Sequence, residues 1–89
     1  MKAVITVVGK DAIGILSKVS SICAENNVNV IEVTQSILQD TFCMIMLTDV
    51  SKCKIPFADF IKSMEKSGND AGLVIHVMHE DIFNSMHRI

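Results

Sequence analysis

The stretch VVGKDAIGILSKVSSICAENNVNV, residues 7–30, decides how this chain folds. An apolar run ends at Gly9, a short polar loop follows, and a helical pattern begins at Gly14. A second apolar run begins at Val28, directly after the helical pattern. Because the first N–H groups of a helix have no partners within the helix, this loop is the first place to expect a bound ligand.

The helical segment places its apolar residues at steps of three and four, on one side of a helix: Ile15, Leu16, Val19, Ile22 and Cys23. Asp11 precedes the helix and is a good N-cap candidate, since aspartate accepts hydrogen bonds from the first N–H groups. Asn26 and Asn27 end the helix, because asparagine tolerates the left-handed conformation that is common there.

Four apolar runs predict strands over residues 3–8, 28–38, 42–50 and 73–78. The first and third runs are apolar on both faces, which is typical of central strands. In the second run, regular alternation places Val28, Val30 and Glu32 on one face of the strand. A turn at residues 39–41 joins the second and third strands as a hairpin.

A second helix is predicted after Pro56, a residue that suits the first turn of a helix. Its apolar stripe consists of Phe57, Phe60, Ile61 and Met64. The glycines of residues 68–72 are predicted to end this helix and turn the chain. Residues 80–87 predict a short C-terminal helical extension, with Ile82, Phe83 and Met86 on one side.

The resulting order is strand, helix, strand, strand, helix, strand and terminal helix, within one α+β domain spanning residues 1–89. It predicts a ferredoxin-like βαββαβ sandwich, a four-stranded antiparallel sheet with two helices on one face. Hydrophobic residues make up 49% of the chain, which is high for a chain of this length. We therefore expect the other sheet face to be covered by the terminal helix, by a second copy, or by both.

The composition argues against several functions. The net charge is −2 and the pI is about 5.8, so no basic stripe is available for nucleic acid. Cys23, Cys43 and Cys53 lack metal-ligand spacing and are expected to be reduced thiols of a cytoplasmic protein. The run at residues 3–8 is too short for a signal-peptide core or a membrane span.

Catalytic and metal chemistry are not expected either. The sequence shows no set of nucleophile, base and orienting acid, so we predict no enzymatic activity and no cofactor. His76 and His79 are three residues apart on a strand and its exit, so their side chains point to opposite faces and predict no shared metal.

The order of elements resembles the ACT domain, a small amino-acid-sensing regulatory module. The resemblance is sharpest in VGKDAIGIL, residues 8–16, and in AENNVNV, residues 24–30. The Asp-x-x-Gly followed by Ile-Leu, and the Asn-Val after the helix, resemble the subtype found in the glycine cleavage system repressor and at the N-terminus of formyltetrahydrofolate deformylase. The chain is also similar to short bacterial proteins that are little more than one such domain.

This resemblance implies a regulatory module that binds a free amino acid or a similar small zwitterion at the interface of a homodimer, without nucleic acid or membrane. The implied ligand-binding positions are Lys10, Asp11, Ala12, Ile13, Gly14 and Ile15 around the first loop, and Asn29 at the start of the second strand. ACT domains commonly carry Arg-Pro-Gly in the loop, where this chain has Ala-Ile-Gly.

Structural interpretations stand beside these functional ones. Gly14 allows a tight turn or a close approach of helix and sheet, Asp11 caps the helix, and Asn29 satisfies backbone groups near a turn. A second hypothesis keeps the fold but has no small ligand. In it, the terminal helix closes a dimer or docks on a regulatory protein through Ile82, Phe83 and Met86.

Overall fold

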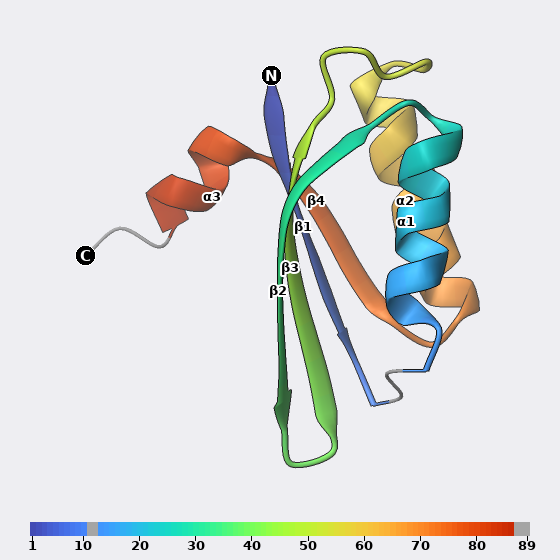
Figure 1. The fold of residues 1–89 in the computed structure, drawn as a ribbon, viewed down its shortest axis with the longest axis vertical. Coiled ribbons are helices and arrows are strands. Elements are labelled where there is room, and N and C mark those ends of the chain that lie inside the picture. The colour runs from blue at the N-terminus through green and yellow to red at the C-terminus, as the bar shows by residue number, and fades with distance from the viewer. Residues whose placement is uncertain (11–12, 87–89) are drawn as a thin grey trace.

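The computed structural model describes residues 1–10 and 13–86. Its elements are β1 (Lys2–Gly9), α1 (Ile15–Glu25), β2 (Asn29–Leu38), β3 (Thr41–Asp49), α2 (Phe57–Asp70), β4 (Val74–His79) and α3 (Glu80–Met86). The strands form one sheet in the order β2-β3-β1-β4, with every neighbouring pair antiparallel. Helices α1 and α2 cover one face and α3 lies on the other (Figure 1). The ferredoxin-like α+β fold with a terminal helix is confirmed, and His87 lies outside the described residues.

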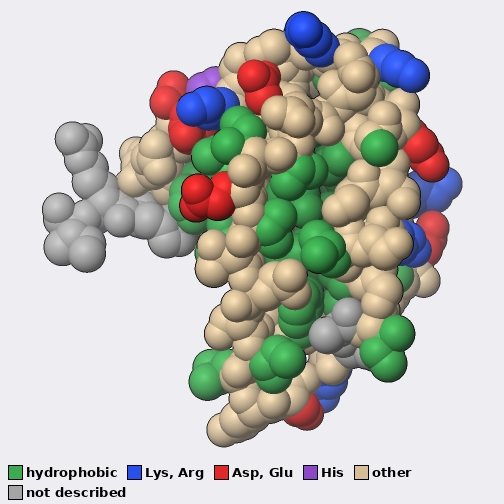
Figure 2. All heavy atoms as spheres, in the orientation of Figure 1, with side chains coloured by type: hydrophobic (Ala, Val, Ile, Leu, Met, Phe, Trp, Pro, Cys, Tyr) green, Lys and Arg blue, Asp and Glu red, His purple; other side chains and the backbone are tan. Residues whose placement is uncertain are grey.

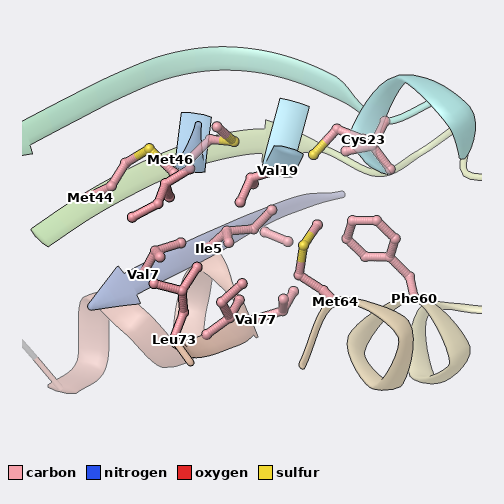
Figure 3. Close-up of a cluster of buried hydrophobic side chains, with 14 of the residues drawn as sticks. Ile5, Val7, Val19, Cys23, Met44, Met46, Phe60, Met64, Leu73 and Val77 are labelled. Atoms are coloured by element: carbon pink, nitrogen blue, oxygen red, sulfur yellow. The ribbon is translucent and has the colours of Figure 1, made fainter. Parts of the chain in front are cut away.

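The core lies between the sheet and the helices α1 and α2. The central strand β1 turns Ala3, Ile5 and Val7 toward the helices, and all three are completely buried. The other members of this cluster come mainly from β3, β4 and both helices, and include Met44, Met46, Val77, Val19, Cys23, Phe60 and Met64 (Figure 3). The two central positions that were predicted for residues 3–8 and 42–50 are therefore confirmed.

Strand β2 departs from the predicted alternation near its start. Its pairing with β3 shifts between Val30 and Glu32, so that Ile31 is the extra residue of a β-bulge. Val28, Val30 and Val33 consequently all pack against the core. The prediction that Glu32 shares a face with Val28 and Val30 is wrong, because a bulge exchanges the inward and outward sets of side chains.

Helix α1 also begins differently from the prediction. Gly14 occupies the N-cap position with φ +75°, and among the described residues no side chain caps the helix. Assigning the N-cap position to Asp11 was therefore wrong, while Asp11 and Ala12 themselves lie outside the described residues. The other end follows the prediction, with Asn26 as the C-cap and Asn27 at φ +60°.

The predicted end of α2 is corrected in a similar way. The helix continues through Gly68 to Asp70, and the chain turns at Gly72, which has φ +74°. A Cβ on Gly68 would lie 2.6 Å from Cγ1 of Ile75. This glycine therefore allows α2 to approach β4 closely, and it does not end the helix. The hairpin turn is also shorter than predicted, since Thr41 already pairs with Leu38.

The second face of the sheet is only partly covered by α3. This helix contacts β1 and β4, and Val4 on this face is buried. Farther along the same face, the side chains of Val8, Ile45 and Val74 remain exposed. One half of the face is thus left open in the single chain.

Candidate functional site

The predicted site residues lie at two opposite ends of the sheet. Lys10 follows β1, and residues 13–15 lead into α1 at the same end. Asn29 begins β2 and pairs with Asp49, which also pairs with Lys2 at the start of β1. Strand β1 has 8 residues, and at about 3.3 Å per residue the two ends are roughly 25 Å apart. A single chain therefore does not bring Asn29 to the loop.

The loop end contains a small hollow, here called the loop hollow, of about 110 Å³. It is lined by Ile13, Gly14, Ile15, Lys18, Ala71 and Leu73. Ile13 is 90% exposed, whereas Ile15 is buried in the core. A Cβ on Gly14 would meet no atom within 4 Å, so its positive φ, and not close packing, favours glycine here.

The opposite end contains a larger hollow, here called the β2 hollow, of about 340 Å³. It is lined by Asn27, Val28, Asn29, Asp49, Ser51 and Lys52. Of these residues, only Asn29 was predicted as a site residue from the sequence. Asp49, Ser51 and Lys52 were missed because they lie at the end of β3 and just after it, and only the hairpin pairing brings this segment beside Asn29.

Hydrogen bonds between distant segments hold the walls of the β2 hollow. The side-chain amide of Asn27 donates to the carbonyl oxygen of Lys52 at 3.1 Å. The backbone N–H of Lys54 donates to the carbonyl oxygen of Asn26 at 3.0 Å. These bonds tie the loop after β3 to the end of α1, so this wall is formed before any ligand arrives.

The carboxylate of Asp49 is held in place by its neighbours. The backbone N–H of Ser51 donates to Oδ1 of Asp49 at 2.9 Å, and the ammonium group of Met1 lies 3.9 Å from the same oxygen. Hydrogen bonds from Ser51 lower the pKa of Asp49 most, and the positive charges of Met1 and Lys2 lower it further. Asp49 is therefore an anion at neutral pH.

Among the described residues, the thiols and imidazoles form no comparable cluster. Burial, together with the nearby Cys53, raises the pKa of Cys23 to about 11, so this thiol stays protonated at neutral pH. His76 and His79 contact different acidic side chains, at 3.8 Å and 3.5 Å. Within residues 1–10 and 13–86, no group of three or more His, Cys, Asp and Glu side chains could hold a metal ion. In the same ranges, no helix is long and apolar enough to cross a membrane.

Comparison with known sequences identifies similar proteins over nearly the whole chain. Residues 2–78 match the ACT domain family. A UPF0237 protein of Methanocaldococcus jannaschii is 44% identical over 88 residues, which cover 99% of this chain and 98% of the relative. A UPF0237 protein of Clostridium perfringens is 49% identical, with full coverage of both chains.

Solved structures agree with this match. An ACT domain protein from Streptococcus pneumoniae has a TM-score of 0.82 and 34% identity, with 98% of each chain covered. A protein described as a glycine cleavage system transcriptional repressor has a TM-score of 0.73 at 21% identity, covering 89% of this chain and 47% of that one. A formyltetrahydrofolate deformylase of Pseudomonas putida has a TM-score of 0.73 at 12% identity, covering 89% and 29%. The last two show a common fold.

Proposed function

The chain belongs to the ACT domain family, and on this premise we propose that it is a regulatory module that binds a free amino acid or a similar small zwitterion between two copies of itself. ACT domains are generally regulatory modules that bind small ligands. The observation that carries the proposal is the separation of Asn29 from the loop in one chain. If Asn29 and the loop after β1 both contribute to one site, one of them must come from a second copy of the chain.

A side-by-side dimer meets this requirement. In a twofold pairing, the β2 strands of two copies run antiparallel along their free edges. The start of β2 in one copy then lies near the end of β2 in the other. Since the loop after β1 lies at the same end of the sheet as the end of β2, Asn29 of one copy faces residues 13–15 of its partner. The twofold axis creates two such sites.

The surface beside β2 supports this arrangement. Strand β2 has 10 residues and, among the described strands, pairs only with β3, so its outer edge offers free backbone groups to a second strand. Figure 2 shows a band of hydrophobic side chains between β2 and α1, here called the β2–α1 seam. Ile31 on β2 and Leu16 on α1 are large exposed apolar residues. A partner laid along this edge would remove such side chains from water.

Leu16 lies on the β2 side of its helix. Lys18 lines the loop hollow with Ala71 and Leu73, so it faces α2 and β4. Residues two positions apart on a helix are separated by about 200°. Leu16 therefore points away from α2, toward the edge where we propose that the partner binds.

Introducing a charge at Leu16 is expected to convert the dimer into a monomer. Leu16→Glu would bury an unpaired carboxylate in the interface, whereas the monomer leaves it in water. Val74→Glu is a matched control, because Val74 is also an exposed apolar residue but lies on β4, at the other edge of the sheet. Sedimentation equilibrium should give a dimer mass for the wild type and Val74→Glu, and a monomer mass for Leu16→Glu. A monomeric wild type, or dissociation caused only by Val74→Glu, would contradict the side-by-side dimer.

Binding of an amino acid is expected to raise the melting temperature. At about 100 times its Kd, a ligand that binds only the folded state stabilises it by about 2.7 kcal/mol. For a domain of this size, this corresponds to a rise of roughly 10–20 °C. Thermal unfolding at fixed protein concentration, with each free amino acid in turn, would reveal a selective rise. No rise with any amino acid would contradict the proposed ligand class.

Two glycine variants test the loop separately from the fold. Gly14 and Gly72 have φ +75° and +74°, and an added Cβ meets no atom within 4 Å at either position. Gly14→Ala and Gly72→Ala should therefore lower stability similarly, by about 1 kcal/mol, through backbone strain. Only Gly14→Ala should also remove the rise caused by the ligand, since Gly14 belongs to the predicted binding loop and Gly72 does not. Equal ligand responses of the two variants would exclude the loop from the site.

A second candidate function is an interaction module of the same fold without a small ligand. It is favoured by α3, in which Ile82 and Met86 are exposed while Phe83 is half-buried. This helix could dock on a second copy or on a regulatory protein. This function would be favoured over the first if no amino acid raised the melting temperature and Phe83→Asp abolished self-association.

A further inference from the structure

The β2 hollow contains charged side chains that the family resemblance does not assign. We propose that Asp49 and Lys52 recognise the two charged ends of the ligand. The carboxylate of Asp49 takes the ammonium group, and Lys52, together with the amide of Asn29, takes the carboxylate. This inference rests on the proposed function, namely that the ligand is a zwitterion, and it adds the residues that select this class.

The sizes of the two hollows favour this placement. Small-molecule sites generally have volumes of about 300–1,000 Å³. The β2 hollow, at about 340 Å³, lies within this range, whereas the loop hollow, at about 110 Å³, falls well below it. Within one chain, the β2 hollow is therefore the better place for the polar head of an amino acid.

The lining of the β2 hollow provides polar groups that are ready to bind. Asp49 uses Oδ1 to accept the N–H of Ser51, and its side chain is exposed to water. Within the described residues, no interaction occupies the side-chain amide of Asn29 or the ammonium group of Lys52. Asn29 and Lys52 can thus bind a ligand without breaking an internal hydrogen bond of their side chains.

The charges around the hollow select against simple ions. A ligand with only a carboxylate would be repelled by Asp49, and a ligand with only an ammonium group would be repelled by Lys52. A zwitterion satisfies both side chains, with charge-assisted hydrogen bonds at both ends. The surrounding groups include two more cations, Lys2 and the ammonium group of Met1, on the side of Asp49.

The ammonium group of Met1 also lies at this corner of the hollow. The ammonium group of Met1 donates to Oγ of Ser51 at 2.7 Å and lies 3.9 Å from Oδ1 of Asp49. The ion pair is exposed to water on both sides, so it competes only weakly with a ligand for Asp49.

The test compares three variants by isothermal titration. Asp49→Asn keeps an oxygen that accepts the N–H of Ser51 but removes the charge, and Lys52→Gln removes the ammonium group. Lys54→Gln is the matched control, since Lys54 is an exposed lysine of the same loop that does not line the hollow. The titrant is the amino acid with the largest thermal rise. Binding should weaken about tenfold or more in the first two variants, with unchanged affinity in the control.

Two derivatives of the same amino acid show which side chain binds its carboxylate and which binds its ammonium group. Its methyl ester lacks the carboxylate, so it should bind wild type and Lys52→Gln equally. Its N-acetyl form lacks the ammonium group, so it should bind wild type and Asp49→Asn equally. If the wild type binds the amino acid but Asp49→Asn and Lys52→Gln bind it as tightly, the role of the β2 hollow is overturned while the proposed function stands. If the wild type binds no amino acid, both are overturned.

Discussion

Replacing Phe60 with alanine is expected to lower the free energy of unfolding by about 3–5 kcal/mol. Phe60 is completely buried on α2 and belongs to the cluster between the helices and the sheet (Figure 3). Removing the ring loses the free energy that its transfer from water into the core contributes. It also leaves a cavity that the surrounding side chains fill only in part. Small domains are stable by roughly 5 kcal/mol or a little more, so this variant should be partly unfolded at room temperature.

Urea unfolding followed by circular dichroism measures this loss. Phe57→Ala is the control, because Phe57 belongs to the same apolar stripe but is only partly buried at the first turn of α2. Its loss should be clearly smaller, about half as large. Equal losses for the two variants would show that burial in the cluster does not determine the stability of α2 on the sheet. An unchanged slope of the unfolding curve would show that both variants unfold from the same compact state.

The fold was predictable from the sequence because its strongest signals are periodic. The apolar steps of three and four in α1 and α2, and the apolar runs of β1 and β3, survive in the structure. The errors of the prediction arise where a single residue interrupts the regular spacing of apolar side chains. The bulge at Ile31 depends on pairing with β3, and the role of Gly68 depends on its contact with Ile75, so neither is a local property of the sequence.

The candidate site was predictable only in part, for a related reason. Asn29 and the loop were identified by their positions in known motifs. Such motifs do not show how far apart Asn29 and the loop lie within one chain. Counting the hairpin from its turn, where Leu38 pairs with Thr41, would have placed Asn29 beside Val50. The bulge shifts this partner by one residue to Asp49. Counting the strand register from the sequence thus predicts the neighbours of Asn29 in the β2 hollow to within one residue. The dimer that we propose depends on the β2–α1 seam, which only the structure reveals.

Alkaline pH is expected to destabilise the protein through Cys23. Burial raises the pKa of this thiol from 9.0 to about 11, with a smaller contribution from Cys53. The unfolded chain therefore loses the thiol proton at a lower pH than the native protein does. The stabilisation is complete below about pH 9 and disappears as the pH rises toward 11, because the native state binds more protons across this interval. A shift of about two pKa units corresponds to about 2–3 kcal/mol.

Urea unfolding at several pH values between about 8 and 11 tests this linkage. As the pH rises, the free energy of unfolding of the wild type should fall more steeply than that of Cys23→Ala. The difference between the two curves gives the contribution of the Cys23 thiol. Cys43→Ala is the matched control, since Cys43 lies only partly buried on β3, outside the cluster that contains Cys23. It should keep the steep fall of the wild type. If Cys23→Ala falls as steeply as Cys43→Ala, the buried thiol is not the group whose ionisation destabilises the core.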